Sequence, residues 1–568
     1  MADFQSTIQE SNTISSRQIV PFRIRIGVTG HRHLTNPKII TQRVVEFFKT
    51  NWVELFDVGP QKIMSSLHHT PLAFVIITAL AEGADQLVSK EILKIPNSRL
   101  DVVLPMTIDD CLKDFADEES RREFMSLVEQ TRSPLCLRKQ NLEHEFDADT
   151  LPEARKQAYE TAGKYVVDHC DLLVALWDGQ PARGQGGTAD TVKYAKAINR
   201  PLVIISTNPP YAIQTEAGHG LSIQALKQIE AFNSFPIPEA RQRSYVQEMY
   251  NFLFNNHHGA KIPSATKELI RDYLLPAYTR ASIITKSNQK MYRQAAFLTY
   301  FLSVIAVSAI AFSVFAVSLA NYAFLLEFVL LMMVLILTIR TNRKKTHQQW
   351  IENRFLTERI RSAIFFAACG VEASQIDIPL YMLTAHRTDD WTIRTFYEIW
   401  NLLPRLASCY GASCQIYCAF VQEVWIQKQI DFHKTAATKN LRISRSLERG
   451  GIGIFVLAML VALVHYLFPL PGRGLISSGW EKVIVFLATI LPAGGAAMSG
   501  IRTHLEYSRI GKRSGNMVLI LKELKSHFTE VNTPAALESL LRQTEELMLR
   551  ESQEWLMLLR FVELKPGT

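Results

Sequence analysis

The sequence has no C-x-x-C cysteine pair, although seven cysteines occur among its 568 residues. This absence disfavours a zinc ribbon or a thioredoxin-like redox motif, and we expect no metal site. The first twenty residues contain no apolar run, so no cleavable signal peptide is expected there. Neither G-x-G-x-x-G nor G-x-x-x-x-G-K-[ST] is present after the first predicted strand, which disfavours a standard NAD oxidoreductase and a P-loop ATPase. We therefore expect no bound cofactor.

The composition indicates a soluble part combined with lipid-facing segments. A chain of 568 residues exceeds one hydrophobic core, and 48% hydrophobic residues accompany only 20% charged residues. The net charge of +8 could suggest nucleic acid. Much of the excess Lys and Arg lies beside the apolar segments, however, so anionic lipid is the expected partner and nucleic acid is not.

Four apolar segments are long enough to cross a membrane as helices. Residues 295–322 contain no charged side chain, and residues 319–339 contain one acid, Glu327. The junction VSLANY leaves room only for a tight turn between these two segments. Residues 450–470 and 483–501 form a second pair around a Pro- and Gly-containing connection. The sequence therefore predicts two helical hairpins. The alternative, buried helices of a large soluble protein, fits the charge-poor runs less well.

Basic residues flank both hairpins on one side. The outer tips hold only Arg473 and Lys482, whereas the following residues lie before and after the hairpins: Lys286, Lys290, Arg293, Arg340, Arg343, Lys344, Lys345, Arg442, Arg445, Arg449, Arg502, Arg509, Lys512 and Arg513. The positive-inside rule then places both termini and residues 341–449 in the cytoplasm. Both hairpins also end in Ile-Arg-Thr, at 339–341 and 501–503, which indicates an internal duplication.

The N-terminal region alternates apolar strands with helices. Strands are predicted at 23–30, 73–78, 102–105, 172–177 and 201–206, and a helix at 37–50 follows the first of them. Continuous apolar strands separated by helices are typical of a parallel sheet that is covered on both faces. The fold class is therefore an α/β parallel-sheet domain joined to an all-α membrane region.

Ligands of such sheets bind at the carboxyl ends of the strands, which directs attention to the loops there. Arg32 can clamp a phosphate, and the glycine-rich turn before the helix TADTVKYAKAI offers free backbone N–H groups. A single glycine-rich turn more often just ends a strand, but several such loops follow successive strands. The candidate ligand-binding residues are Thr29, Gly30, His31, Arg32, Glu82, Gly83, Asp85, Asp178, Gly179, Gly184, Gly186, Gly187, Thr188 and Asp190.

Three of these motifs carry a family resemblance. Residues 27–32, 81–85 and 173–190 resemble the motifs of the SLOG superfamily, a Rossmann-like group that includes the LOG phosphoribohydrolases and bacterial nucleotide sensors. The paired hairpins resemble the SLATT family of two-helix membrane effectors. These resemblances imply a bacterial inner-membrane protein that senses a nucleotide-derived or NAD-derived ligand and then forms a pore or perturbs the membrane, in antiviral defence.

The resemblance also bears on catalysis. LOG enzymes carry a glutamate in their glycine-rich loop, and Thr191 occupies that position here, with Asp190 one residue earlier. Cleavage of an N-glycosidic bond needs a carboxylate, so we expect binding without turnover and no catalytic residue. Glu82 and Asp85 keep open the alternative of a membrane-anchored LOG-like nucleotide or nucleoside hydrolase. Their other expected roles are ribose recognition or, for Asp85, a helix N-cap.

The expected domain organisation follows from these segments. Residues 20–210 form the nucleotide-binding domain, 211–294 a linker and helical stalk that Pro276 could kink, and 295–375 the first two-helix module. Residues 376–449 form a cytoplasmic connector and 450–568 the second module. The amphipathic helix after the first hairpin, with Trp350, Phe355, Ile360 and Ile364 on one side, suits packing within a bundle or in a homo-oligomer.

Overall fold

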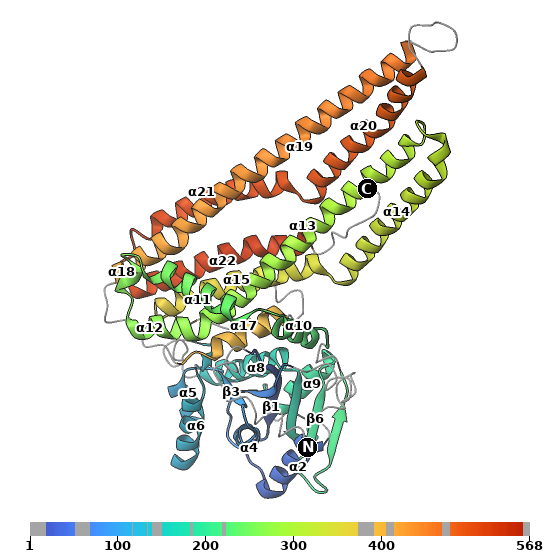
Figure 1. Ribbon diagram of the computed structural model, residues 1–568. Helices are drawn as coiled ribbons and strands as arrows, with labels where there is room; N and C mark the ends of the chain where they lie inside the picture. Colours follow the sequence, from blue (N-terminus) through green and yellow to red (C-terminus); the bar gives the residue numbers. More distant parts are fainter. Residues whose placement is uncertain are drawn as a thin grey trace. The chain divides into compact units, whose positions relative to one another are not determined.

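The chain forms two compact units (Figure 1). One unit comprises Met1–Pro236 and Ser374–Arg405, and the other comprises Ile237–Ala373 and Leu406–Thr568. The chain therefore passes from one unit to the other three times. The computed structural model describes residues 19–50, 69–115, 117–132, 134–138, 150–181, 186–218, 223–372, 391–404, 414–467 and 478–559.

The first unit is built on a mostly parallel sheet. Its seven described strands follow the order β4-β3-β2-β1-β5-β6-β7, and β7 alone pairs in the antiparallel direction. Their bounds are β1 Phe22–Gly30, β2 Leu72–Thr78, β3 Arg99–Leu104, β4 Leu135–Cys136, β5 Leu172–Trp177, β6 Leu202–Ser206 and β7 Ile213–Glu216. The predicted α/β class and the five predicted strands are confirmed.

Two strands were not predicted, and each lacks the apolar run that marks a buried strand. β4 has only two residues, and β7 reads Ile-Gln-Thr-Glu with three exposed side chains. Both lie at an edge of the sheet, where polar residues are tolerated because one side meets solvent.

Helices cover both faces of the sheet. Helices α8 and α9 pack on one face, where Val166, Val167, Val192 and Ala195 join strand residues in a buried cluster, and α2 packs against α4 (Figure 1). The helices of this unit before the membrane region are α2 Pro37–Thr50, α4 Ala84–Leu93, α5 Ile108–Leu112, α6 Glu118–Gln130, α8 Leu151–His169, α9 Thr188–Ala197 and α10 Ile223–Ser234.

A helix from the predicted connector belongs to this same unit. Helix α17, Trp391–Asn401, lies in the sequence between the two hairpins, yet it packs against α10 and contacts the amino ends of the strands. The Trp391 ring lies 6.0 Å from that of Phe232. Arg394 forms an ion pair of 2.5 Å with Asp171, the residue before β5. Part of the segment between the hairpins therefore completes the α/β unit.

The second unit is helical. In its first half, α11 Glu239–Phe254 and α12 Ser264–Leu269 precede a π-helical turn, Ile270–Leu274, and then α13 Leu275–Phe312, the turn η5 Val317–Leu319, α14 Ala320–Arg343 and α15 Thr346–Ala368. In its second half, α18 Cys414–Phe420 precedes a π-helical turn, Val421–Ile426, and then α19 Gln427–Leu467, α20 Ser478–His504, α21 Tyr507–His527 and α22 Pro534–Leu559.

The two halves repeat one order of elements. In each half, a π-helical turn leads into a long helix, which is followed by a second long helix. A residue in the left-handed backbone conformation lies just after the end of this second helix. These residues are Lys345, with φ 49° and ψ 36°, and Glu506, with φ 49° and ψ 31°. A non-glycine residue in this conformation is uncommon, so its recurrence at the same place favours the predicted duplication.

Four described helices are long and apolar enough to cross a membrane: they lie within Ser264–Phe312, Val317–Ala368, Cys414–Leu467 and Lys482–His527. The stalk and the first membrane segment form one continuous helical stretch, Ser264–Phe312, in which the π-helical turn Ile270–Leu274 ends two residues before Pro276, the predicted position of a kink. The turn between the first two segments begins earlier than predicted, and it includes the first three residues of VSLANY, Val317–Leu319, as η5. Helix α13 ends at Phe312, because Ser313 bonds the Ile310 carbonyl through both its N–H (3.0 Å) and its hydroxyl (2.7 Å).

Close packing joins the two hairpins within this unit. Helix α13 contacts α14, α15 and α20, and a Cβ on Gly500 of α20 would lie 2.4 Å from the Tyr300 ring of α13. Gly494 faces open space, so only part of the small-residue face is used. The amphipathic face of α15 is buried within the chain, because α15 packs against α13 and α22.

Candidate functional site

A pocket of about 450 Å³ opens at the carboxyl ends of β1, β2 and β5. This volume lies within the range of small-molecule sites in proteins. The predicted residues that line it are Thr29, Gly30, His31, Arg32, Asp85, Asp178, Gly186, Gly187 and Thr188. Glu82, Gly83, Gly179 and Asp190 do not line it, and Gly184 lies outside the described residues. The fold thus brings together loops that are up to 159 residues apart in the sequence, from Thr29 to Thr188.

The loop after β1 is tied to the loop after β5. The His31 Nε2 atom lies 3.0 Å from Asp178 Oδ1 and 3.2 Å from the Asp178 backbone nitrogen. A protonated ring donates to the carboxylate, whereas a neutral Nε2 accepts from the backbone N–H. In either state His31 fixes the two loops to each other at the pocket wall.

Arg32 belongs to a network on the opposite wall. Its guanidinium lies 5.2 Å from the centre of the Tyr159 ring and 3.8 Å from Asp114 Oδ2. Asp114 also accepts hydrogen bonds from Arg155, at 2.6 Å, and from the Tyr159 hydroxyl. One carboxylate therefore faces two guanidinium groups. With Lys156 also at the wall, this side of the pocket has an excess of positive charge.

Four residues that line this pocket were not predicted from the sequence: Asp114, Arg155, Lys156 and Tyr159. Three of them lie within α8, between β4 and β5, and not in a loop at the carboxyl end of a strand. A signal was present, because Arg155, Tyr159 and Gly163 recur at every fourth position and so share one face of a helix.

Two of the predicted glycines serve packing between loops. A Cβ on Gly83, which has φ +82°, would lie 2.0 Å from the Arg32 carbonyl oxygen. A Cβ on Gly30 would lie 2.4 Å from the Ala84 Cβ. The Ala84 N–H donates to the His31 carbonyl at 3.1 Å. These glycines allow the loops after β1 and β2 to touch.

The start of α9 has the geometry of an anion site. Gly186 adopts φ +81°, and its N–H donates to Asp190 Oδ2 at 3.0 Å, which fixes the turn. Gly187 is the N-cap residue, and no side chain caps the helix. The first-turn N–H groups of this ten-residue helix therefore face the pocket edge with the positive end of the helix dipole.

Asp85 is the buried acid of the pocket. Its Oδ2 atom accepts hydrogen bonds from the Thr78 hydroxyl at 2.8 Å and from the Ala81 N–H at 3.2 Å. Burial raises the pKa of Asp85 to about 7, against the opposing effects of these two donors and of Arg32. Asp85 caps no helix, since Gly83 is the N-cap of α4. A buried acid that titrates near neutrality and lines a cleft is a candidate functional group.

Glu82 lies outside the pocket, whereas Thr191, which the resemblance compares with the LOG glutamate, lies at the pocket wall. Glu82 accepts a hydrogen bond from Ser120 at 2.7 Å and does not line the pocket. The Thr191 hydroxyl donates to the Gly187 carbonyl at 3.3 Å, and its side chain fills the space beside Gly163. The position of the LOG glutamate therefore holds a packed hydroxyl that cannot ionise.

The described residues contain no group of three or more His, Cys, Asp or Glu side chains that could hold a metal ion. The pocket can instead bind an anion through guanidinium groups and helix N–H donors, with carboxylates available for hydroxyl groups. Comparison of the chain with protein-family models, curated proteins and solved structures finds no match.

Proposed function

We propose that the protein is a membrane effector that is controlled by a nucleotide-derived or NAD-derived ligand. The observation that carries this proposal is the pocket of about 450 Å³, which Arg32, Arg155 and Lys156 line together with the uncapped start of α9. Guanidinium groups and helix N-termini are the two groups that proteins use most directly to bind phosphate. The carboxylates of Asp114 and Asp178 suit ribose hydroxyls.

The membrane region supplies the response. Ligand binding changes the α/β unit, which includes α17, and α17 is tethered in sequence to helices of both hairpins. A response by four helices explains why the chain carries more than the single helix that anchoring needs. We propose that these helices form a pore or perturb the lipid of a bacterial inner membrane, as a homo-oligomer, in antiviral defence.

Substitutions at Gly187 test the link between the two activities. Gly187→Asp places a carboxylate at the N-cap, where Asp is favoured and φ −81° is allowed. This carboxylate would occupy the anion site and repel a phosphate. Gly187→Asn is the matched control, because it has the same shape without the charge. We expect dye release from liposomes on addition of ADP-ribose for the wild type, reduced release for Gly187→Asn, and none for Gly187→Asp.

The result that would overturn the proposal is equal release by all three proteins, or release by none with any nucleotide tried. Membrane insertion of each variant is checked by flotation with the liposomes. The expected topology is tested separately, by reporter fusions at residues 205, 400 and 568, which should all be cytoplasmic, and near Arg473, which should not.

A second candidate function is a membrane-anchored nucleotide or nucleoside hydrolase. The observation that favours it is the buried Asp85, whose pKa of about 7 suits a general acid. Against it stands Thr191, which cannot act as an acid or a base at neutral pH. Chromatography of the ligand after incubation decides between them. Catalytic consumption that Asp85→Asn abolishes, together with sealed liposomes, would establish the hydrolase.

A further inference from the structure

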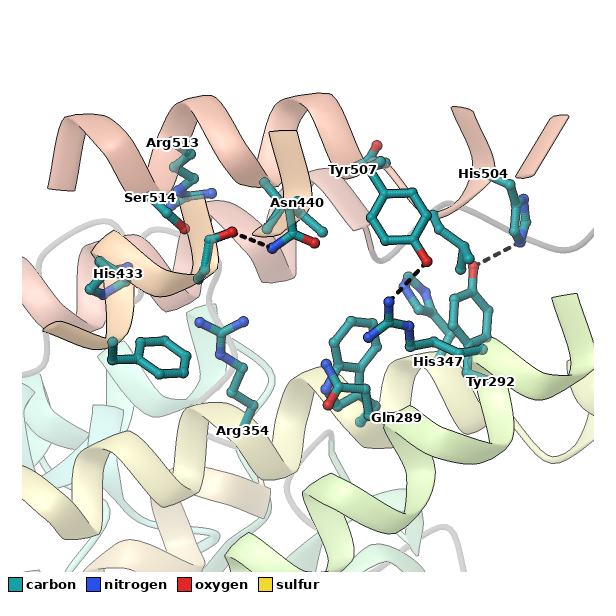
Figure 2. A pocket seen from close by; sticks show the side chains of 17 residues that line it. Gln289, Tyr292, His347, Arg354, His433, Asn440, His504, Tyr507, Arg513 and Ser514 are labelled. Atoms are coloured by element: carbon teal, nitrogen blue, oxygen red, sulfur yellow. Dashed lines mark hydrogen bonds between the residues drawn. The ribbon is translucent and has the colours of Figure 1, made fainter. Parts of the chain in front are cut away.

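A second cavity lies within the helical unit, and it is built by both hairpins. It has a volume of about 140 Å³ and is lined by α13 and α15 from the first half of the unit and by α19, the end of α20 and α21 from the second half (Figure 2). Figure 2 shows Arg354 extending from α15 toward α19 and α21. The cavity is therefore the place where the cytoplasmic ends of the two repeats meet.

The lining is strongly basic. It contains three arginines and three histidines but one acid, Glu506. The Glu506 Oε1 atom is bonded to Arg509 at 3.3 Å, and Arg509 does not line the cavity. The cavity therefore combines three permanent positive charges with a single carboxylate that already contacts another cation. The basic residues are Arg293, Arg354, Arg513, His347, His433 and His504.

Aromatic contacts fix one wall of the cavity. The Tyr292 hydroxyl lies 2.9 Å from His504 Nε2, and the Tyr292 ring stacks on His347 at 4.4 Å (Figure 2). Arg293 donates to the Tyr507 hydroxyl at 2.9 Å and lies 5.5 Å from the centre of that ring. Both partners of Arg293 in this contact are neutral, so its charge is oriented there and not cancelled. Buried aromatic surroundings strengthen the attraction of an anion, because they exclude water.

The position and size of the cavity limit what it can hold. On α13, the exposed apolar residue Phe297 lies about one turn beyond the cavity residue Arg293, whereas on α19 Ile452 lies about three turns beyond Asn440. The cavity thus lies beside the end of the apolar span on α13. Its 140 Å³ is below the range of whole-ligand pockets and is about a third of the α/β pocket volume, so it suits one compact group.

We propose that this cavity binds a phosphate group in the form of a phosphomonoester. Guanidinium groups match the geometry of phosphate oxygens, and basic pockets between membrane helices on the cytoplasmic side suit anionic head groups. The phosphate comes either from an anionic lipid or from a soluble phosphate compound. Because its ligands come from both hairpins, the bound group links the two repeats and stabilises one arrangement of their cytoplasmic ends.

The test uses the full chain in detergent and the shift of its unfolding temperature with added probe. The probes are phosphatidic acid, a phosphomonoester lipid; phosphatidylglycerol, a phosphodiester lipid; and inorganic phosphate. Every measurement is made in the Gly187→Asp background, so that binding at α9 does not contribute. Failure of this proposal is then distinct from failure of the function proposed for the α/β pocket.

We expect phosphatidic acid to stabilise the protein more than phosphatidylglycerol does. Arg354→Gln and Arg513→Gln should each raise the half-effective probe concentration by about tenfold or more, because each removes a charge-assisted contact. Arg445→Gln is the matched control. Arg445 is exposed on α19, does not line the cavity, and carries the same charge, so this variant should bind like the parent protein.

A response to phosphatidic acid alone identifies a lipid head group, and an equal response to inorganic phosphate identifies a soluble phosphate compound. Equal loss in Arg445→Gln would show that only overall charge matters and would overturn the proposal. So would a parent protein that no probe stabilises. If Arg354→Gln or Arg513→Gln does not fold, Arg513→Lys keeps the charge but loses the planar fork, and it should still weaken binding severalfold.

Discussion

The two ends of the parallel sheet use the same residue types for different purposes. At the amino ends of the strands, Asp171 is fully buried and contacts Arg25 at 2.7 Å and Arg394 at 2.5 Å. At the carboxyl ends, the side chain of Arg32 is 42% exposed and lies 3.8 Å from Asp114. Arginine and aspartate thus form a closed structural cluster at one end and an open, solvent-facing cluster at the other.

The cause of the difference is the cover over each end. Helix α17 closes the amino ends, where Glu398 pairs with Arg23 at 2.5 Å and Arg132 donates to the Trp400 carbonyl at 2.6 Å. Burial alone would raise the pKa of Asp171, but the guanidinium groups of Arg25 and Arg394 outweigh it and hold that pKa well below its usual value. At the carboxyl ends the pocket replaces this cover. The more exposed charges at this end, such as Arg32, are accessible to a ligand.

The largest effect is expected at the closed end. Asp171→Ala should destabilise the α/β unit by ~3–5 kcal/mol, because Arg25 and Arg394 would stay buried without their counter-charge. The measurement is hydrogen exchange of the β1 and β5 amides in the full chain. Glu46→Ala is the control, since the pair of Glu46 with Arg43 is exposed, and exposed pairs contribute ~0–1 kcal/mol. Equal exchange in the two variants would show that the buried cluster does not hold this end together.

The next effect separates a packed glycine from an open one. Gly83→Ala should cost more than ~2 kcal/mol, because φ +82° and the nearby Arg32 carbonyl both oppose a Cβ. Gly179→Ala, with φ +80° but no atom within 4 Å of its Cβ position, should cost only ~1–2 kcal/mol. Denaturant midpoints, measured by proteolysis of the α/β unit, show whether Gly83→Ala destabilises the unit more than Gly179→Ala does. The reverse order would mean that the loop contact at Gly83 adapts easily.

The sequence predicted the parts of this unit that follow periodic rules. Five strands and the helix at Pro37–Thr50 come from apolar runs and local turn residues, so local reasoning finds them. Helix α17 is different, because its own pattern indicates a helix but does not name the surface that Trp391 and Arg394 cover. Local sequence patterns also did not reveal which residues outside the strand ends would reach the pocket. Tyr159 reaches the pocket through the packing of α8, and Asp114 lies just after the short helix α5, so neither is in a loop that directly follows a strand.

At the open end, a change in binding is expected with little change in stability. Arg32→Ala should weaken the binding of ADP-ribose about tenfold or more, because a charge-assisted contact contributes ~1.5–3 kcal/mol. Its effect on unfolding should stay within ~0.5 kcal/mol, as for other partly exposed side chains. Calorimetric titration of the full chain measures the affinity for ADP-ribose. Arg43→Ala is the control, because Arg43 lies outside the pocket. Unchanged affinity in Arg32→Ala would place the ligand elsewhere.

The smallest effect concerns pH, and it depends on Asp85. Burial raises the pKa of this group from 3.8 to about 7, so between these values the folded state binds a proton that the unfolded state does not. The stability of the α/β unit should therefore fall as the pH rises from about 4 to about 7, and then level off. Binding of an anion should follow the same direction, since ionised Asp85 repels it.

We expect the affinity for ADP-ribose to decrease a few-fold as the pH rises from 6 to 8, through the pKa of about 7. ADP-ribose is the suitable probe, because its pyrophosphate diester keeps a constant charge over this range. Asp85→Asn is the matched variant, because its amide oxygen can still accept from the Thr78 hydroxyl and the Ala81 N–H. The variant should lose most of the pH dependence and keep the affinity that the wild type has at low pH. A slope that is equal in both proteins would show that Asp85 does not cause the pH dependence.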